Sequence, residues 1–170
     1  TLSAVNDSAS IDALRRALAL DPARAVTYQD LSIVYHITGR NDHALALVDS
    51  AVALDPDGPF RGVRALFRLT AGDTAGAVAD ARLSLSRSLP ILAGFAHDSA
   101  AARAMEASVP QPVCRRGIVV TSDAIAYLVW TGRRELAVQQ VLACGASLNT
   151  RWWLRLPVLA PLADDPRIQA

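Results

Sequence analysis

Residues 25–56, AVTYQDLSIVYHITGRNDHALALVDSAVALDP, decide the fold that we expect. Apolar side chains recur there at helical spacing, first at Tyr28, Leu31, Val34 and Tyr35 and then at Ala44, Leu47, Val48, Ala51 and Val52. Thr38, Gly39 and Arg40 separate the two stripes, and glycine reverses a chain at low cost. The second stripe ends before Pro56, since the residue before a proline is disfavoured in a helix. The stretch predicts two helices joined by a turn.

The same pattern returns along the chain with a period close to 34 residues. Pro22, Pro56 and Pro90 are each 34 residues apart, and ALALDP at 17–22 echoes AVALDP at 51–56. An alanine follows a glycine by five residues in three places, which are Gly39 and Ala44, Gly72 and Ala77, and Gly132 and Ala137. A small residue at such a place lets two helix backbones approach closely. We therefore predict an all-α chain of repeated helix pairs.

We interpret residues 1–170 as one domain of several segments. These are a partial repeat at 10–22 with Ser10 as helix cap, repeats at 25–56, 58–90 and 118–149, an irregular segment at 91–117 and a C-terminal cap at 150–170. In the irregular segment, Asp98 is expected to cap a helix that Pro110 and Pro112 prevent from continuing. A degraded repeat and an insertion are both open there. The C-terminal prolines permit only brief helical turns, and Trp152 and Trp153 are expected to cover the last repeat.

Residues 25–56 resemble a tetratricopeptide repeat, a helix–turn–helix unit of 34 residues. The matching positions are Tyr28, Leu31, Tyr35, Gly39, Ala44, Ala51 and Pro56, and Ser32 stands where the pattern often has glycine. The resemblance implies a superhelix of antiparallel helix pairs whose first helices line a concave groove for a protein or peptide. PLADDPR at 161–167 also resembles the closing segment of bacterial multidomain regulators, among them winged-helix activators, Ser/Thr kinases and nucleotide cyclases.

The resemblance also implies which side chains line the groove. They are Val26, Gln29, Ile33 and His36 in the first full repeat and Phe60, Val63 and Phe67 in the second. Phe60 and Phe67 are either anchors for a partner or packing between repeats. Gln29 and Ile33 do not match the basic and Asn positions that clamp a chaperone's carboxylate terminus in one branch of the family, so we do not expect that activity.

A stripe of three arginines lies beside the expected groove. Arg61, Arg64 and Arg68 share one helix face through their spacing of three and four residues. One interpretation is a solvated face. The other is an anion-recognising stripe, because the guanidinium fork matches carboxylates and phosphates. In the second case Arg64 favours acidic groups of a partner at the groove edge.

Composition limits the classes of function. The chain is 52% hydrophobic and 19% charged, as in globular domains, and its net charge of +1 gives no global electrostatic case for binding nucleic acid. No apolar run is long enough to insert into a membrane. All 17 basic residues are arginine, which with the many alanines indicates a GC-rich bacterial genome. Because the chain begins at Thr1, we expect a module of a longer bacterial protein, either cytoplasmic or an extracytoplasmic part of a membrane-anchored regulator.

No motif for catalysis, metal or cofactor appears. The three histidines lack the convergent ligands of a metal site, and neither a phosphate-binding glycine loop nor a G-x-S-x-G motif occurs. Cys114 and Cys144 are either bonded to each other or a loop thiol and a buried thiol. We therefore expect no enzyme. The leading interpretation is a protein- or peptide-binding scaffold; the alternatives are a regulatory domain attached to a signalling output domain and a self-association module.

Overall fold

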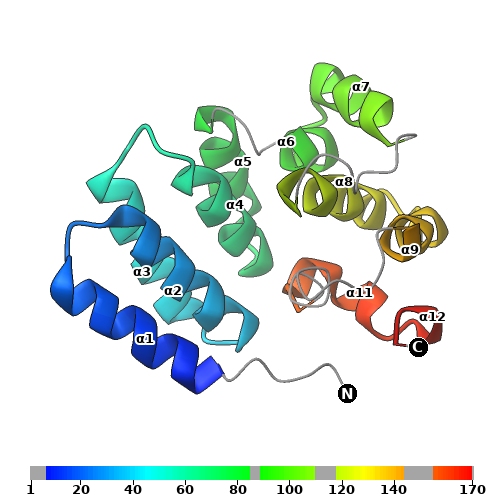
Figure 1. Cartoon of the computed structure of the whole chain (residues 1–170). Helices are drawn as coiled ribbons and strands as arrows, with labels where there is room; N and C mark the ends of the chain where they lie inside the picture. The colour runs from blue at the N-terminus through cyan, green and yellow to red at the C-terminus, as the bar shows by residue number, and fades with distance from the viewer. Residues whose placement is uncertain (1–6, 85–88, 110–117, 144–154, 170) are drawn as a thin grey trace. The chain divides into compact units, whose positions relative to one another are not determined.

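The computed structural model describes residues 7–84, 89–109, 118–143 and 155–169. The described part is helical and contains no strand, which confirms the predicted all-α class (Figure 1). The helices are α1 Asp7–Leu20, α2 Ala25–Ile37, α3 Asn41–Leu54, α4 Phe60–Thr70, α5 Thr74–Leu83, α6 Leu89–Phe95, α7 Ser99–Ser108, α8 Ile118–Trp130, α9 Arg134–Ala143, the short 3-10 helix η2 Pro157–Leu159, α11 Ala160–Ala163 and α12 Pro166–Gln169.

The chain divides into two compact units, residues 3–88 and residues 89–170, where the sequence led us to expect one domain. The first unit holds α1 to α5, and the second holds α6 to α12. Each has a set of helices that pack on one another, so each is described by itself. Among the described residues, no helix is long and apolar enough to cross a membrane.

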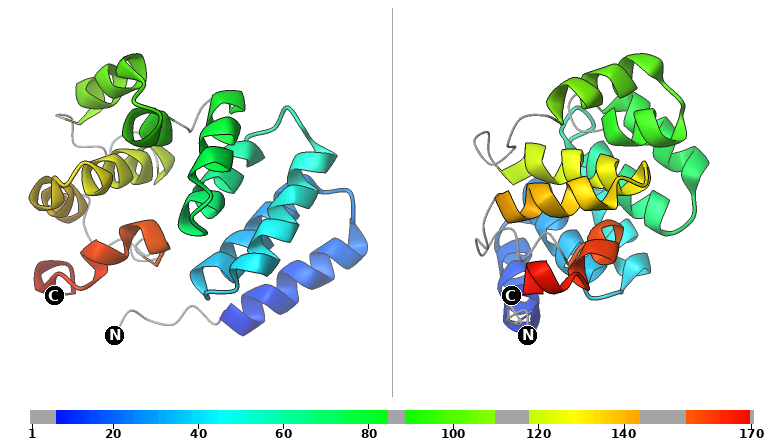
Figure 2. Two further views of the ribbon diagram at one scale, coloured as in Figure 1. Left: turned by 180° about the vertical axis from the view of Figure 1, so that it is seen from behind. Right: turned by 90° about the vertical axis from the view of Figure 1, so that its right-hand side faces the viewer.

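In the first unit, each helix packs on the next one along the chain. α2 contacts α3, α3 contacts α4, α4 contacts α5, and α2 also touches α4; these helices can be followed in Figure 2. Ala51, Val52 and Phe60 form one cluster of the core, with Ala25 and Tyr28 packed against it. α1 packs on α2 and begins at Asp7, so Ser10 lies within the helix and the expected cap at that residue is wrong.

The three glycines predicted to turn the chain share one backbone conformation. Gly39, Gly72 and Gly132 have φ angles of 79°, 86° and 76°, a left-handed region that side chains with a Cβ rarely adopt. At the first turn, the N–H of Gly39 donates to the carbonyl of His36, and the N–H of Arg40 donates to that of Tyr35. Both later turns repeat these two hydrogen bonds at the same spacing. This pattern is the glycine C-cap that ends many helices.

The alanine five residues after each glycine is fully buried. Ala44, Ala77 and Ala137 are each 0% exposed. Each donates its N–H to the carbonyl of the residue that follows the glycine, which is Arg40, Asp73 or Arg133. Three separate stretches of sequence therefore build the same turn and the same first helical bond, as their common spacing predicts.

In the second unit, residues 91–109, the described part of the segment predicted to be irregular, are more regular than the sequence suggested. α6, which begins just before that range at Leu89, packs on α7, and both contact α8. Asp98 accepts hydrogen bonds from the N–H groups of Ala100 and Ala101, which confirms its predicted role as the cap of α7. The sequence missed α6 because its seven residues, LPILAGF, are apolar throughout and show no amphipathic period.

The core of the second unit is built mainly by α7, α8, α9 and the C-terminal segment. Its largest buried members are Met105, Ile125, Tyr127, Leu128, Leu159 and Leu162. The short turns at residues 157–169 confirm the prediction of brief helices between prolines. Cys114, Cys144, Trp152 and Trp153 lie outside the described residues, so the predicted disulfide and tryptophan cover remain predictions.

Candidate peptide-binding groove

The seven predicted groove residues and an eighth, Arg64 at the groove edge, all lie on two helices that touch, α2 and α4. Four of the eight are buried, namely Ile33, His36, Phe60 and Phe67. Val26 is 41% exposed, while Gln29, Val63 and Arg64 are half-buried. The apolar surface left for a partner is therefore much smaller than the sequence pattern implied.

Phe67 and His36 meet each other rather than solvent. Their rings stack with centroids 4.1 Å apart and planes inclined by 22°. Their exposed fractions are only 1% each, and Phe60 is 5% exposed among Ala51 and Val52. Phe60 and Phe67 therefore pack between helices rather than serve as anchors for a partner, because neither ring is accessible in this conformation.

The His36 side chain is a buried polar group with one partner. Its Nδ1 lies 3.0 Å from Oδ1 of Asn41, the first residue of α3. Burial lowers the pKa of the imidazole to about 4, against an opposing contribution from the Asn41 hydrogen bond. The ring is therefore neutral at pH 7. A carbonyl-type oxygen accepts, so the neutral ring carries its proton on Nδ1.

The arginine stripe of α4 faces a buried carboxylate that sequence reasoning missed. Asp80 on α5 has a side chain only 3% exposed. Arg64 donates to both of its oxygens, from Nε at 2.7 Å and from Nη2 at 2.6 Å. Arg68 lies 3.0 Å from the same carboxylate and Arg61 lies 3.8 Å from it. Arg64 also donates to the exposed Asp49 at 2.8 Å.

This cluster occupies positions that carry uncharged residues in the preceding repeat. Counted from the turn glycine, Arg64 and Arg68 occupy the positions of Leu31 and Tyr35, and Asp80 occupies the position of Leu47. The hydrogen bonds from Arg64 to Asp80 raise the pKa of that guanidinium further, so it stays charged. The interpretation of the stripe as a free anion-recognising surface is corrected for Arg64, because its fork is already occupied by Asp80 and Asp49.

A second polar cluster joins α7, α8 and the turn that precedes α9 in the second unit. Glu106 on α7 accepts from the hydroxyl of Tyr127 at 2.8 Å and from two nitrogens of Arg133 at 2.9 and 2.7 Å. The Arg133 guanidinium carbon lies 5.0 Å from the centre of the Tyr127 ring. The hydrogen bonds from Arg133, and then that from Tyr127, lower the pKa of the Glu106 carboxyl.

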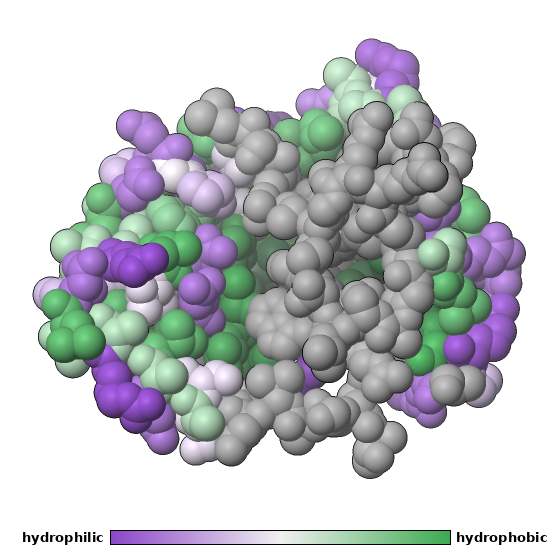
Figure 3. All heavy atoms as spheres, viewed as in Figure 1, coloured by the Kyte–Doolittle hydropathy of each residue, from purple (hydrophilic) through white to green (hydrophobic). Residues whose placement is uncertain are grey.

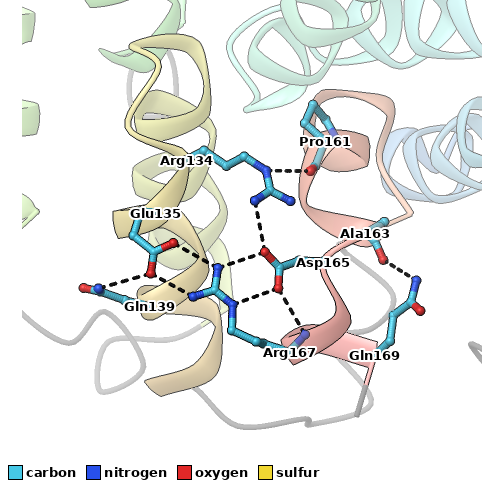
Figure 4. Close-up of polar contacts among 8 residues, drawn as sticks. All are labelled: Arg134, Glu135, Gln139, Pro161, Ala163, Asp165, Arg167 and Gln169. Carbon is cyan, nitrogen blue, oxygen red and sulfur yellow. Dashed lines mark hydrogen bonds and ion pairs between the residues drawn. The ribbon is translucent and has the colours of Figure 1, made fainter.

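The PLADDPR segment is held by a third cluster, shown in Figure 4. Asp165 accepts from Arg167 at 2.9 Å and from Arg134 of α9 at 3.0 Å, and its side chain is 3% exposed. Arg167 in turn donates to both carboxylate oxygens of Glu135, also on α9. These ion pairs, led by the bond from Arg167, depress the pKa of Asp165. The segment is therefore fixed to α9 by charge as well as by Leu162.

Exposed apolar side chains occur on several helices of both units. Among the described residues, the large ones are Leu20, Val26, Leu54, Leu83, Leu89 and Leu142. On the face seen in Figure 3, apolar and polar residues alternate over the described part of the first unit. Isolated exposed apolar residues are normal on a protein surface, so none of them marks a docking site by itself.

Within the ranges that the structure describes, no three His, Cys, Asp or Glu side chains come together as a metal site would require. Neither the models of known protein families nor the curated proteins contain a significant match to this chain. The arrangement of the helices and their side chains is therefore what supports a function.

Proposed function

We propose that this chain is a tetratricopeptide-like helical repeat module that binds a protein or peptide and performs no chemistry itself. The observation that carries the proposal is the repetition of one turn, in which a left-handed glycine is followed after five residues by a fully buried alanine. A repeated helix pair is a scaffold, and its function lies in the surface that it presents.

The surface that fits a partner is the α2–α4 side of the first unit. Val26, Gln29 and Val63 are the predicted groove residues that remain at least partly exposed and free of ion pairs there. The stack of His36 on Phe67 fixes these two helices against each other, so the three side chains stand on a rigid support. A preorganised surface lowers the entropic cost of binding.

Site-specific photo-crosslinking in the source cell tests the proposal. A photoreactive amino acid is placed at Gln29 or Val63, and at Ala53 on α3 as an exposed control. We expect one shared adduct from the first two positions and none from the control. Adducts of the chain with itself would favour the self-association module, and equal labelling at all three positions would contradict a groove.

The regulatory alternative rests on the C-terminal segment. PLADDPR resembles the closing segment of bacterial regulators, and Asp165 of that motif is the carboxylate held by Arg134 and Arg167. These ion pairs explain why the motif contains both acidic and basic residues. In this alternative the module receives a signal and passes it to an attached output domain.

A further inference from the structure

Three cationic or titratable side chains converge on Tyr35 in the first unit. Arg15 of α1 donates from Nη2 to the Tyr35 hydroxyl at 2.6 Å. The guanidinium carbon of Arg40 lies 4.5 Å from the centre of the Tyr35 ring, and the His43 ring lies 5.5 Å from it. We call these four residues the Tyr35 cluster. Tyr35 is buried, whereas the other three side chains are exposed.

The Tyr35 cluster is unbalanced in charge. In the part of the chain that is described, neither Arg15 nor Arg40 takes part in any of the ion pairs found. Asp12 of α1 and Asp42 of α3 are the nearest acids in sequence, and both are exposed and outside those pairs. Both guanidinium groups contact the same phenol, so a carboxylate that reaches both would gain Coulomb attraction from two positive charges.

The second unit shows what completes such a pair. Arg133 follows Gly132 as Arg40 follows Gly39, and it likewise lies over a tyrosine, Tyr127. There a carboxylate, that of Glu106, accepts from the tyrosine hydroxyl and from both terminal nitrogens of the arginine. The protein therefore already contains a carboxylate seated on a tyrosine–arginine pair beside a turn of the same kind.

The Tyr35 cluster has the same donors without the carboxylate. Tyr35 is 3% exposed and its hydroxyl accepts from Arg15, so the exposed guanidinium groups of Arg15 and Arg40 are the donors that a partner can reach. The N-terminus of α3 also favours a negative charge at this place. Arg40 occupies its cap position and provides no side-chain acceptor for the first N–H groups. Tyr35 is one residue closer to its glycine than Tyr127 is, so the two sites are alike in chemistry and differ in detail.

We propose that the Tyr35 cluster binds a carboxylate of an aspartate or glutamate side chain in a partner protein. The proposal rests on the protein-binding function above and adds a second contact point, formed by α1, α2 and α3. The two exposed guanidinium forks supply charge-assisted hydrogen bonds to the carboxylate, as the Arg133 guanidinium does to Glu106 in the second unit.

The test follows arginine side-chain N–H signals of the whole chain by NMR. The probes are the capped peptide acetyl-Ala-Ala-Glu-Ala-Ala-amide and its glutamine counterpart, and Arg15→Lys and Arg40→Lys assign the two signals. We expect the glutamate peptide alone to shift both signals in a saturable manner. Arg82, an exposed arginine outside the ion pairs found in the described residues, should not respond. Arg40→Gln should weaken binding roughly tenfold, the loss expected for one charge-assisted hydrogen bond.

The Glu106 site provides an internal positive control. Glu106→Ala removes the resident carboxylate, so the Arg133 signal should then respond to the glutamate peptide, as it should not in the parent chain. If the glutamine peptide shifts Arg15 and Arg40 equally, or if neither peptide does, the proposal is overturned. If inorganic phosphate binds and the glutamate peptide does not, the site belongs to phosphate and the carboxylate proposal is again overturned. The crosslinking experiment is independent of this titration. If Gln29 and Val63 crosslink a partner but the titration overturns the carboxylate site, the proposed function stands and only the further inference is wrong.

Discussion

The imidazole of His36 stacks on the ring of Phe67, with 4.1 Å between the two ring centroids. His36 belongs to α2 and Phe67 to α4, so this contact ties two successive helix pairs of the first unit together. The resemblance to the tetratricopeptide repeat predicts both residues in a peptide groove. Their position in the core makes the stability of the unit, rather than partner binding, the property that depends on them.

Truncation of Phe67 should therefore destabilise the protein strongly. Phe67→Ala removes a ring that is 1% exposed and is expected to cost about 3–5 kcal/mol in the free energy of unfolding. Val26→Ala, at a 41% exposed position on α2, is the control and should change it by less than about 0.5 kcal/mol. Urea unfolding followed by circular dichroism measures both. Equal effects would contradict the placement of Phe67 in the core.

Because the pKa of His36 is lowered in the folded protein, the free energy of unfolding decreases as the pH falls. The folded chain takes up this proton only near pH 4, whereas the unfolded chain takes it up near 6.5, so the unfolded state binds more protons between these values. Stability from this group is complete above pH 6.5 and is lost as the pH falls through that window, with a slope of at most about 1.4 kcal/mol per pH unit. Unfolding of the parent chain and of His36→Gln should differ in slope between pH 7 and pH 5. Parallel curves would show that His36 is not buried as a neutral ring.

Removal of the buried carboxylate at Asp80 should cost far more than removal of its exposed counterpart. Asp80→Asn removes the negative charge that Arg64 and Arg68 share and replaces one acceptor oxygen by a donor, and breaking a buried ion pair costs about 3–5 kcal/mol. Asp49→Asn breaks a contact to the same Arg64 at a half-exposed side chain, which is worth at most about 1 kcal/mol. Thermal unfolding of the two variants compares them directly. A similar loss from both would mean that Asp80 does not organise the arginine stripe.

The sequence was most informative where a local rule applies. Gly39, Gly72 and Gly132 were identified as turns, and the alanine after each was identified as a close contact, because left-handed backbone and tight packing restrict the residue type. Helical spacing alone does not show whether a residue lines a groove or lies in the core. Residues such as His36 and Phe67 show the same helical spacing whether a ligand or another helix covers them.

The polar clusters were beyond prediction for a different reason. Arg64 and Asp80 are 16 residues apart, and Glu106 and Arg133 are 27 apart, so only the packing of the helices brings them together. An arginine stripe without its carboxylate looks like a solvent-exposed or anion-binding face. A comparison of the repeats position by position does give a signal, since Asp80 stands where Leu47 stands in the preceding repeat.

If the three glycine turns are copies of one packed helix pair, overpacking the alanine of each should destabilise the protein to a similar extent. Ala44→Leu, Ala77→Leu and Ala137→Leu each force a larger side chain into a position that is 0% exposed. Each should lower the free energy of unfolding by about 1–3 kcal/mol, whereas Ala46→Leu and Ala79→Leu, at exposed neighbours, should be nearly neutral. Three similar losses are the predicted result. An unchanged stability for any one of the three would contradict the repeat at that turn.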